Sequence, residues 1–119
     1  MVTMPGNAIA ALTLILTVSF AHSYLGEKYL LALLMKRDLP RLFNDREDLF
    51  TKQVLRFAWH LTSLAWVGLG FIIWVEPSAK IFHAVGSIFF LHAPLPLIWT
   101  RGRHLSWLVF LAIGILLWA

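Results

Sequence analysis

Residues 57–75 read FAWHLTSLAWVGLGFIIWV, nineteen residues without a single charged side chain. An α-helix rises about 1.5 Å per residue, and the hydrocarbon core of a bilayer is about 30 Å thick. Nineteen helical residues are therefore enough to cross the core once. The run predicts a transmembrane helix rather than a helix of a soluble domain.

Three further apolar runs predict three further transmembrane helices, so that the four spans cover residues 6–25, 57–75, 79–99 and 104–119. The last run is the shortest and is expected to span only barely. Apolar residues make up 60% of the chain and charged residues 13%, which excludes a disordered chain and disfavours an ordinary soluble domain. The predicted fold is an all-α integral membrane protein, with residues 1–119 forming one antiparallel bundle of four transmembrane helices.

A charged segment, residues 36–53, separates the first two spans. It mixes charges with leucine and phenylalanine, which is typical of an element lying on the inner membrane surface, although an ordinary charged loop fits equally well. Helix formers after Leu25 are expected to carry the first helix past the membrane edge until Pro40 ends it. Asn44 and Glu47 have the spacing of a capping box, which predicts the start of the second helix.

The basic residues indicate the orientation. Seven of the ten lie between the first two spans, two lie between the last two, and only Lys80 lies on the opposite side. Because basic loops stay cytoplasmic, both termini are expected on the non-cytoplasmic side of a bacterial-type inner membrane. Trp59 is expected at the inner membrane boundary. The net charge of +4 thus reflects topology and not nucleic-acid binding, and the absence of cysteine excludes thiolate metal sites.

Five histidines stand in or beside the apolar runs, and three of them fall at membrane depth. Counted along the helices, His22, His60 and His92 lie about 21, 24 and 16 Å below the outer edge, within a slab of roughly 8 Å. Ionisable side chains inside a bilayer are costly and mark candidate functional sites. His83 and His104 fall close to the two membrane surfaces and are expected to be interface residues.

Polar and small residues recur on one face of each of the first two helices, at helical spacings of three, four and seven. Such faces turn inward in membrane bundles, because small side chains permit close approach and polar ones hydrogen-bond across. We therefore expect His22 to face His60, with Glu27 and Arg56 just beneath them. The two faces comprise Ser19, His22, Ser23 and Gly26 on the first helix, and Gln53, Arg56, His60 and Ser63 on the second.

The third helix is less simple. His83 and Gly86 share a small-residue face, and His92, nine residues after His83, points about 180° away from it. If the small face packs inward, His92 faces lipid or another chain, which favours an oligomer or a partner interface. Pro94 and Pro96 are expected to kink or loosen this half of the helix, and the kink could rotate His92.

Three chemistries fit these residues. A haem b site would use His22 and His60 as axial ligands, or either of them with His92. A zinc, copper or iron ion would use His22, Glu27 and His60, since no thiolate is present. A proton or quinone path would run along Glu27, Arg56 and His60 from the inner surface, because carboxylate–histidine chains are common in proton relays.

A structural role is the alternative. Here the histidines and hydroxyl groups are interhelical hydrogen-bond partners that bind no cofactor, and the chain is an accessory subunit or assembly factor. The expected partners are the lipid bilayer and either further copies of the chain or other membrane subunits. The sequence contains no Gly-x-Ser-x-Gly, phosphate-binding glycine loop or His-Glu-x-x-His motif, and so offers no support for an enzyme.

Overall fold

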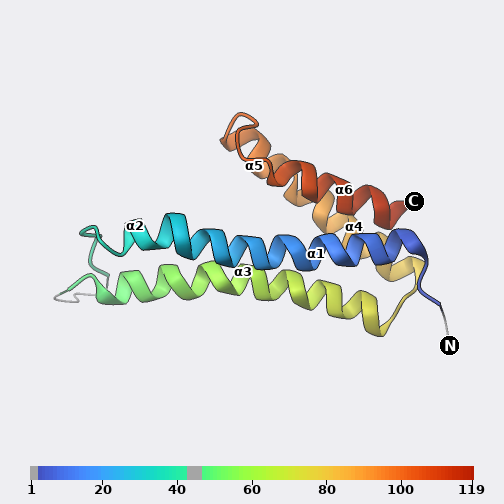
Figure 1. The fold of residues 1–119 in the computed structure, drawn as a ribbon, viewed down its shortest axis with the longest axis horizontal. Coiled ribbons are helices and arrows are strands. Elements are labelled where there is room, and N and C mark those ends of the chain that lie inside the picture. The colour runs from blue at the N-terminus through green and yellow to red at the C-terminus, as the bar shows by residue number, and fades with distance from the viewer. Residues whose placement is uncertain (1–2, 43–46) are drawn as a thin grey trace. The chain divides into compact units, whose positions relative to one another are not determined.

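A computed structural model describes residues 3–42 and 47–119, and this part of the chain contains helices and turns but no strand. The prediction of an all-α protein is confirmed for these residues. In chain order the elements are α1 (Gly6–Leu25), the π-helix η1 (Gly26–Leu31), α2 (Ala32–Leu34), α3 (Leu49–Val75), α4 (Ala79–His92), α5 (Pro94–Trp99) and α6 (Ser106–Trp118), as Figure 1 shows.

The first three elements form one continuous helix, Gly6–Leu34, which confirms that the first helix extends past Leu25. The helix ends before Pro40, as expected. Its six-residue π-helical stretch begins at Gly26. A π-helical turn holds one more residue than an α-helical turn, and such turns occur frequently at functional sites.

The start of α3 differs from the prediction. The helix begins two residues after Glu47, and Asn44, the predicted capping residue, lies outside the described residues. Asp48 holds the beginning of the helix: its Oδ2 accepts the Leu39 amide at 2.8 Å and pairs with Lys52 Nζ at 3.2 Å. The hydrogen bond from Leu39, assisted by Lys52, holds the pKa of the Asp48 carboxyl below its ordinary value of 3.8.

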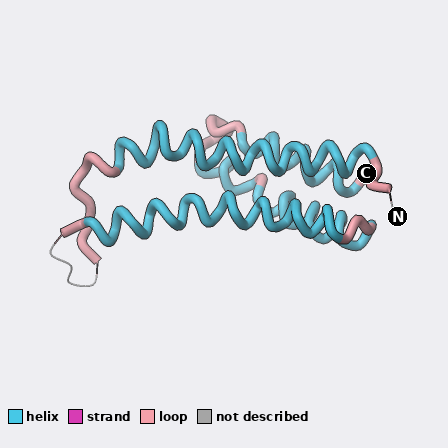
Figure 2. The backbone as a smooth tube through the Cα atoms, turned by 60° about the horizontal axis from the view of Figure 1, so that its bottom comes forward, coloured by secondary structure: helices cyan, strands magenta, loops and turns pink. Residues whose placement is uncertain are grey.

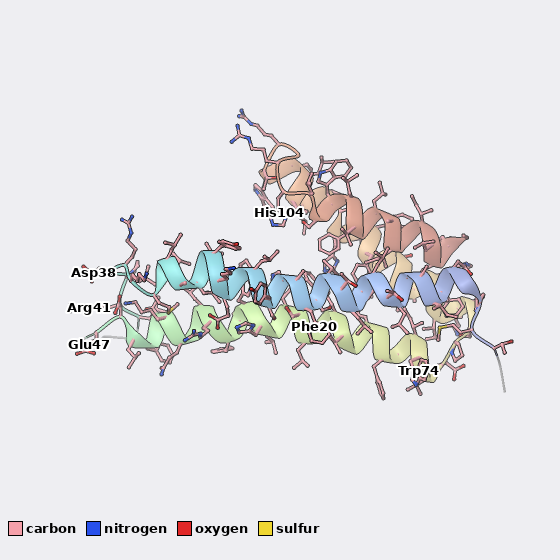
Figure 3. All side chains as sticks on the ribbon, in the orientation of Figure 1. Phe20, Asp38, Arg41, Glu47, Trp74 and His104 are labelled. Atoms are coloured by element: carbon pink, nitrogen blue, oxygen red, sulfur yellow. The ribbon has the colours of Figure 1, made fainter. Side chains whose placement is uncertain are left out.

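Charged side chains gather where the loop joins α2 to α3. Figure 3 labels Asp38, Arg41 and Glu47 at this end. The loop is also tied to the helix, because Thr51 Oγ1 donates to the Pro40 carbonyl at 2.6 Å. That residues 36–53 lie on a membrane surface stays a prediction.

The prolines interrupt the third helix as predicted. Helix α4 ends at His92, Ala93 forms a turn, and α5 begins at Pro94. The break has a simple cause, since Pro94 and Pro96 have no amide hydrogen to donate to the preceding turn. The turn after α5 contains two left-handed residues, Arg101 with φ of 52° and Gly102 with φ of 78°.

Helices α4 and α6 pack along each other. Glycine makes the close approach possible: a Cβ atom on Gly86 would lie 2.8 Å from Trp118, and one on Gly114 would lie 2.6 Å from Phe90. Both distances are far below van der Waals contact, so a larger residue at either position would push the helices apart.

Three helices are long and apolar enough to cross a bilayer: Gly6–Leu34, Leu49–Val75 and Ala79–Trp99. The fourth apolar run forms the shorter helix that its length predicted, and that it crosses a bilayer stays a prediction. Its helix, α6, has 13 residues and therefore extends only about 20 Å, less than the hydrocarbon thickness. The described chain has three long candidate spans and one shorter apolar helix, which indicates an integral membrane protein.

The chain divides into two compact units. One comprises Met1–Val18 and Trp66–Ala119; the other, Ser19–Ala65, is called the hairpin unit below. In the hairpin unit the second half of α1, with η1 and α2, runs side by side with the first half of α3, as Figures 1 and 2 both show. That residues 1–119 form one four-helix domain stays a prediction.

Candidate functional site

The hairpin unit contains a continuous chain of hydrogen-bonding side chains. His22 Nδ1 lies 2.9 Å from Ser63 Oγ, and Ser23 Oγ donates to Ser63 Oγ at 2.7 Å. His60 Nδ1 lies 2.9 Å from the same Ser23 oxygen. The links alternate between the two helices. The structure thus brings His22 and His60 into one network, joined through two serine hydroxyls.

Glu27 continues the chain at its other end. Its Oε1 lies 3.0 Å from His60 Nε2. The same carboxylate accepts two hydrogen bonds from Arg56, from Nε at 2.7 Å and from Nη2 at 2.9 Å. This two-pronged pairing fixes the plane of the carboxylate as well as its position. Glu27 and Arg56 therefore lie beside His60, where the helical spacing places them.

The network is most exposed at Arg56 and most buried at Ser63. The side chain of Arg56 is 55% exposed and that of Glu27 is 34% exposed, whereas Ser63 is only 6% exposed. Hydrogen bonds in a water-poor environment are stronger, and an unpaired polar group there is costly. The open end therefore carries the charges, and the buried end carries the neutral hydroxyl groups.

Trp59 covers the His22 end. Its indole lies parallel to the His22 ring with centroids 4.3 Å apart, and its Nε1 donates to the His22 carbonyl at 2.8 Å. Gly26 makes room for it, because a Cβ atom on that residue would overlap the indole. From its sequence position Trp59 was expected only at the inner membrane boundary. The available signal was Gly26, a small residue one helical turn after His22.

His92 belongs to the other unit, and the sequence left open which way its ring faces. It does not present a bare ring to lipid: Nδ1 lies 2.8 Å from the Ile88 carbonyl, and Nε2 accepts from Trp66 Nε1 at 3.3 Å. Phe89 and Phe110 also lie against the ring. The phase argument assumed one packed face on α4, but α4 contacts side chains of both α3 and α6.

The two remaining histidines each have a side-chain partner, and that they lie at the membrane surfaces stays a prediction. The His83 ring stacks on Trp118 with centroids 4.3 Å apart. His104 Nδ1 lies 2.7 Å from Ser106 Oγ, within the turn that leads into α6. Neither histidine needs a ligand to explain its position.

The geometry gives the haem and metal hypotheses no support. Both ring nitrogens of His60 are already paired, one with Ser23 and the other with Glu27. His60 could therefore ligate iron only by breaking one of these bonds. Among the described residues, moreover, no group of three or more histidine, aspartate or glutamate side chains is arranged to hold a metal ion. A site built from His22, Glu27 and His60 is thus not favoured.

What the network can do follows from its chemistry. It places a carboxylate, an imidazole and two hydroxyl groups in line before a second imidazole, and each of these groups can pass a proton to its neighbour. Comparison of the chain with models of protein families, with curated proteins and with solved structures found no match.

Proposed function

We propose that this small helical membrane protein relays protons along the network in its hairpin unit. Glu27 is the entry, His60 the proton-carrying switch and His22 the far acceptor. One observation carries the proposal: every link from Glu27 through His60, Ser23 and Ser63 to His22 is between 2.7 and 3.0 Å long. Proton transfer between side chains requires unbroken contact at this distance.

The hydrogen-bond directions give the transfer step. Ser23 donates to Ser63, so its oxygen accepts from His60 Nδ1–H, while His60 Nε2–H donates to Glu27. In the starting state of the proposed relay both His60 nitrogens donate, so that the ring is a cation paired with the carboxylate. Ser63 then donates to Nδ1 of a neutral His22.

Three proton transfers in the same direction reverse the hydrogen bonds from His60 to His22. The Nδ1 proton of His60 passes to Ser23, the Ser23 proton passes to Ser63, and the Ser63 proton passes to His22 Nδ1. His60 becomes neutral and His22 becomes the cation, so one positive charge has moved and each serine keeps one proton. Before the next transfer His22 must release its extra proton and the hydroxyl groups must rotate back, which a serine can do because its hydrogen turns about a single bond. The His60 ring must also turn over, so that its bare nitrogen faces Glu27 and can accept a proton from it.

Arg56 is a positioning residue in this proposal. Its fork holds the Glu27 carboxylate in place beside His60. The basic residues near this end support a cytoplasmic placement for the entry. A reporter enzyme fused after Ala119 tests the orientation, because activity confined to the cytoplasm would reverse it.

A purely structural role is the second candidate. The Arg56–Glu27 fork and the Trp59 indole both join the two helices of the hairpin unit, as an assembly factor or accessory subunit would require. Hydrogen bonds between membrane helices average only about 0.6 kcal/mol each, so such a joint needs no catalytic purpose. The two candidate functions predict different effects on proton flux when a serine hydroxyl of the network is removed.

The test is proton flux into liposomes that contain the purified full-length chain, an internal pH dye and a potassium–valinomycin potential. We expect Ser23→Ala to lower the flux by about 100-fold, because it removes the central link without changing any charge. Glu27→Gln should lower it similarly by removing the entry. Ser87→Ala is the matched control, since among the described residues that hydroxyl hydrogen-bonds to the His83 carbonyl of its own helix and to no other group.

Thermal unfolding of the same variants separates the two roles. Ser23→Ala should unfold within about 1 kcal/mol of the native chain, because it loses only weak interhelical hydrogen bonds. Flux that survives Ser23→Ala undiminished, or that the native chain lacks, refutes the relay and leaves the structural role.

A further inference from the structure

The hairpin unit has a hollow along one face of α3, with a volume of about 720 Å³. Its size falls in the range of pockets that hold small molecules. Its lining changes character along the helix, from polar residues near the loop end to apolar ones further along. The lining residues are Gln53, Arg56, Phe57, His60, Leu61 and Leu64.

The polar end offers hydrogen-bond donors that the protein does not use. Arg56 gives Nε and one Nη2 hydrogen to Glu27, which leaves its Nη1 amino group without a partner among the described residues. Gln53 is exposed and likewise has no hydrogen-bond partner within the described ranges. His60 contributes the surface of its ring, since both nitrogens are engaged. The end of the hollow therefore suits a group rich in acceptor oxygens.

The other end suits a hydrocarbon chain. Phe57, Leu61 and Leu64 recur at spacings of four and three, so they form one apolar stripe. Their exposed fractions are 59%, 56% and 64%, which is unusually open for side chains of this size. Lipid is the surrounding medium for such a stripe in a membrane-spanning helix.

We propose that this hollow binds one anionic phospholipid, with the phosphate at Arg56 and Gln53 and an acyl chain along Phe57, Leu61 and Leu64. A guanidinium matches phosphate oxygens in geometry and charge. Charge complementarity favours an anionic headgroup over a zwitterionic one, because residues 28–56 contain seven basic side chains against four acidic ones. Lipid binding does not require proton transfer, so this proposal is independent of the proposed relay and is tested separately.

The experiment is native mass spectrometry of the full-length chain in detergent, titrated with equal amounts of phosphatidylglycerol and phosphatidylcholine. We expect the first bound lipid to be phosphatidylglycerol, preferred about fivefold over phosphatidylcholine. Arg56→Gln should reduce the preference to about one. The matched control is Arg103→Gln, which also removes one exposed guanidinium but lies in the turn before α6; it should keep the preference.

A second variant tests the tail without altering charge. Leu64→Trp fills the apolar part of the hollow from an exposed position and should weaken binding of both lipids several-fold while the chain still folds. Three results would overturn the proposal: no preference in the native chain, an equal loss in Arg103→Gln, or displacement of phosphatidylglycerol by an uncharged quinone analogue. The last would assign the hollow to a neutral lipid instead.

Discussion

Gly26 offers a sharp test of how the hairpin unit is packed. A Cβ atom at this position would lie 2.8 Å from Trp59 Cδ1 and closer still to other atoms of the indole ring. The ring cannot easily move away, because it stacks on His22 and donates to the His22 carbonyl at 2.8 Å. Gly26→Ala therefore has to displace a side chain that is held in two ways.

The magnitude follows from three contributions. Overpacking at a tight contact costs about 1–3 kcal/mol, and loss of the indole hydrogen bond costs about 1 kcal/mol more. The helix propensity of alanine returns about 1 kcal/mol. Gly26→Ala should thus lower the free energy of unfolding by about 1–3 kcal/mol.

Gly68 provides the matched control. It lies within α3, and a Cβ atom there would meet nothing within 4 Å. Gly68→Ala should therefore raise the free energy of unfolding by about 0.4–1 kcal/mol, so the two glycine-to-alanine changes should have opposite signs. Reversible unfolding in mixed detergent micelles, followed by circular dichroism, measures both. Equal effects of the two substitutions would show that Trp59 does not pack on Gly26.

Two further predictions concern single side chains. The carboxyl of Asp48 should titrate below its ordinary pKa of 3.8 because the Leu39 amide favours its ionised form; this stabilisation should be complete above pH 3.8 and lost as the pH falls through the lowered pKa. Carbon-detected NMR measures the midpoint, and an unshifted value would contradict the contact. His92 should carry its proton on Nδ1 at neutral pH, since Nδ1 faces the Ile88 carbonyl and Nε2 accepts from Trp66. Nitrogen NMR distinguishes the tautomers, and Trp66→Phe should shift only the Nε2 signal.

The sequence was most informative about features that depend on one helix at a time. The length of residues 57–75 predicted a span, and Pro94 and Pro96 predicted the break that follows His92. The spacing of polar residues also placed His22 and His60 on facing surfaces, because periodicity reports which side of a helix is polar.

Contacts that depend on how neighbouring helices are positioned could not be predicted from the sequence. Periodicity marks a face but not how many neighbours the helix has. For this reason the surroundings of His92 stayed open between lipid and another chain, whereas Trp66 and Phe110 lie against it in the structure. Ser23 and Ser63 were recognised as marking inward faces, but their mutual hydrogen bond depends on the axial register of the two helices. No sequence pattern predicted the π-helical stretch after Leu25.

The π-helical stretch bears on the proposed relay. Glu27 lies in its first turn, immediately after the serine–histidine face of α1. A π-helical turn rotates the residues after it relative to an uninterrupted α-helix, and it leaves a backbone ladder that is weaker than the α-helical one. This turn carries Glu27, which pairs with Arg56 as well as with His60, so it would also serve a joint between the helices. The contact with His60 Nε2 extends the hydrogen-bonded chain to the exposed end of the network, and this is the property that the proposed relay requires.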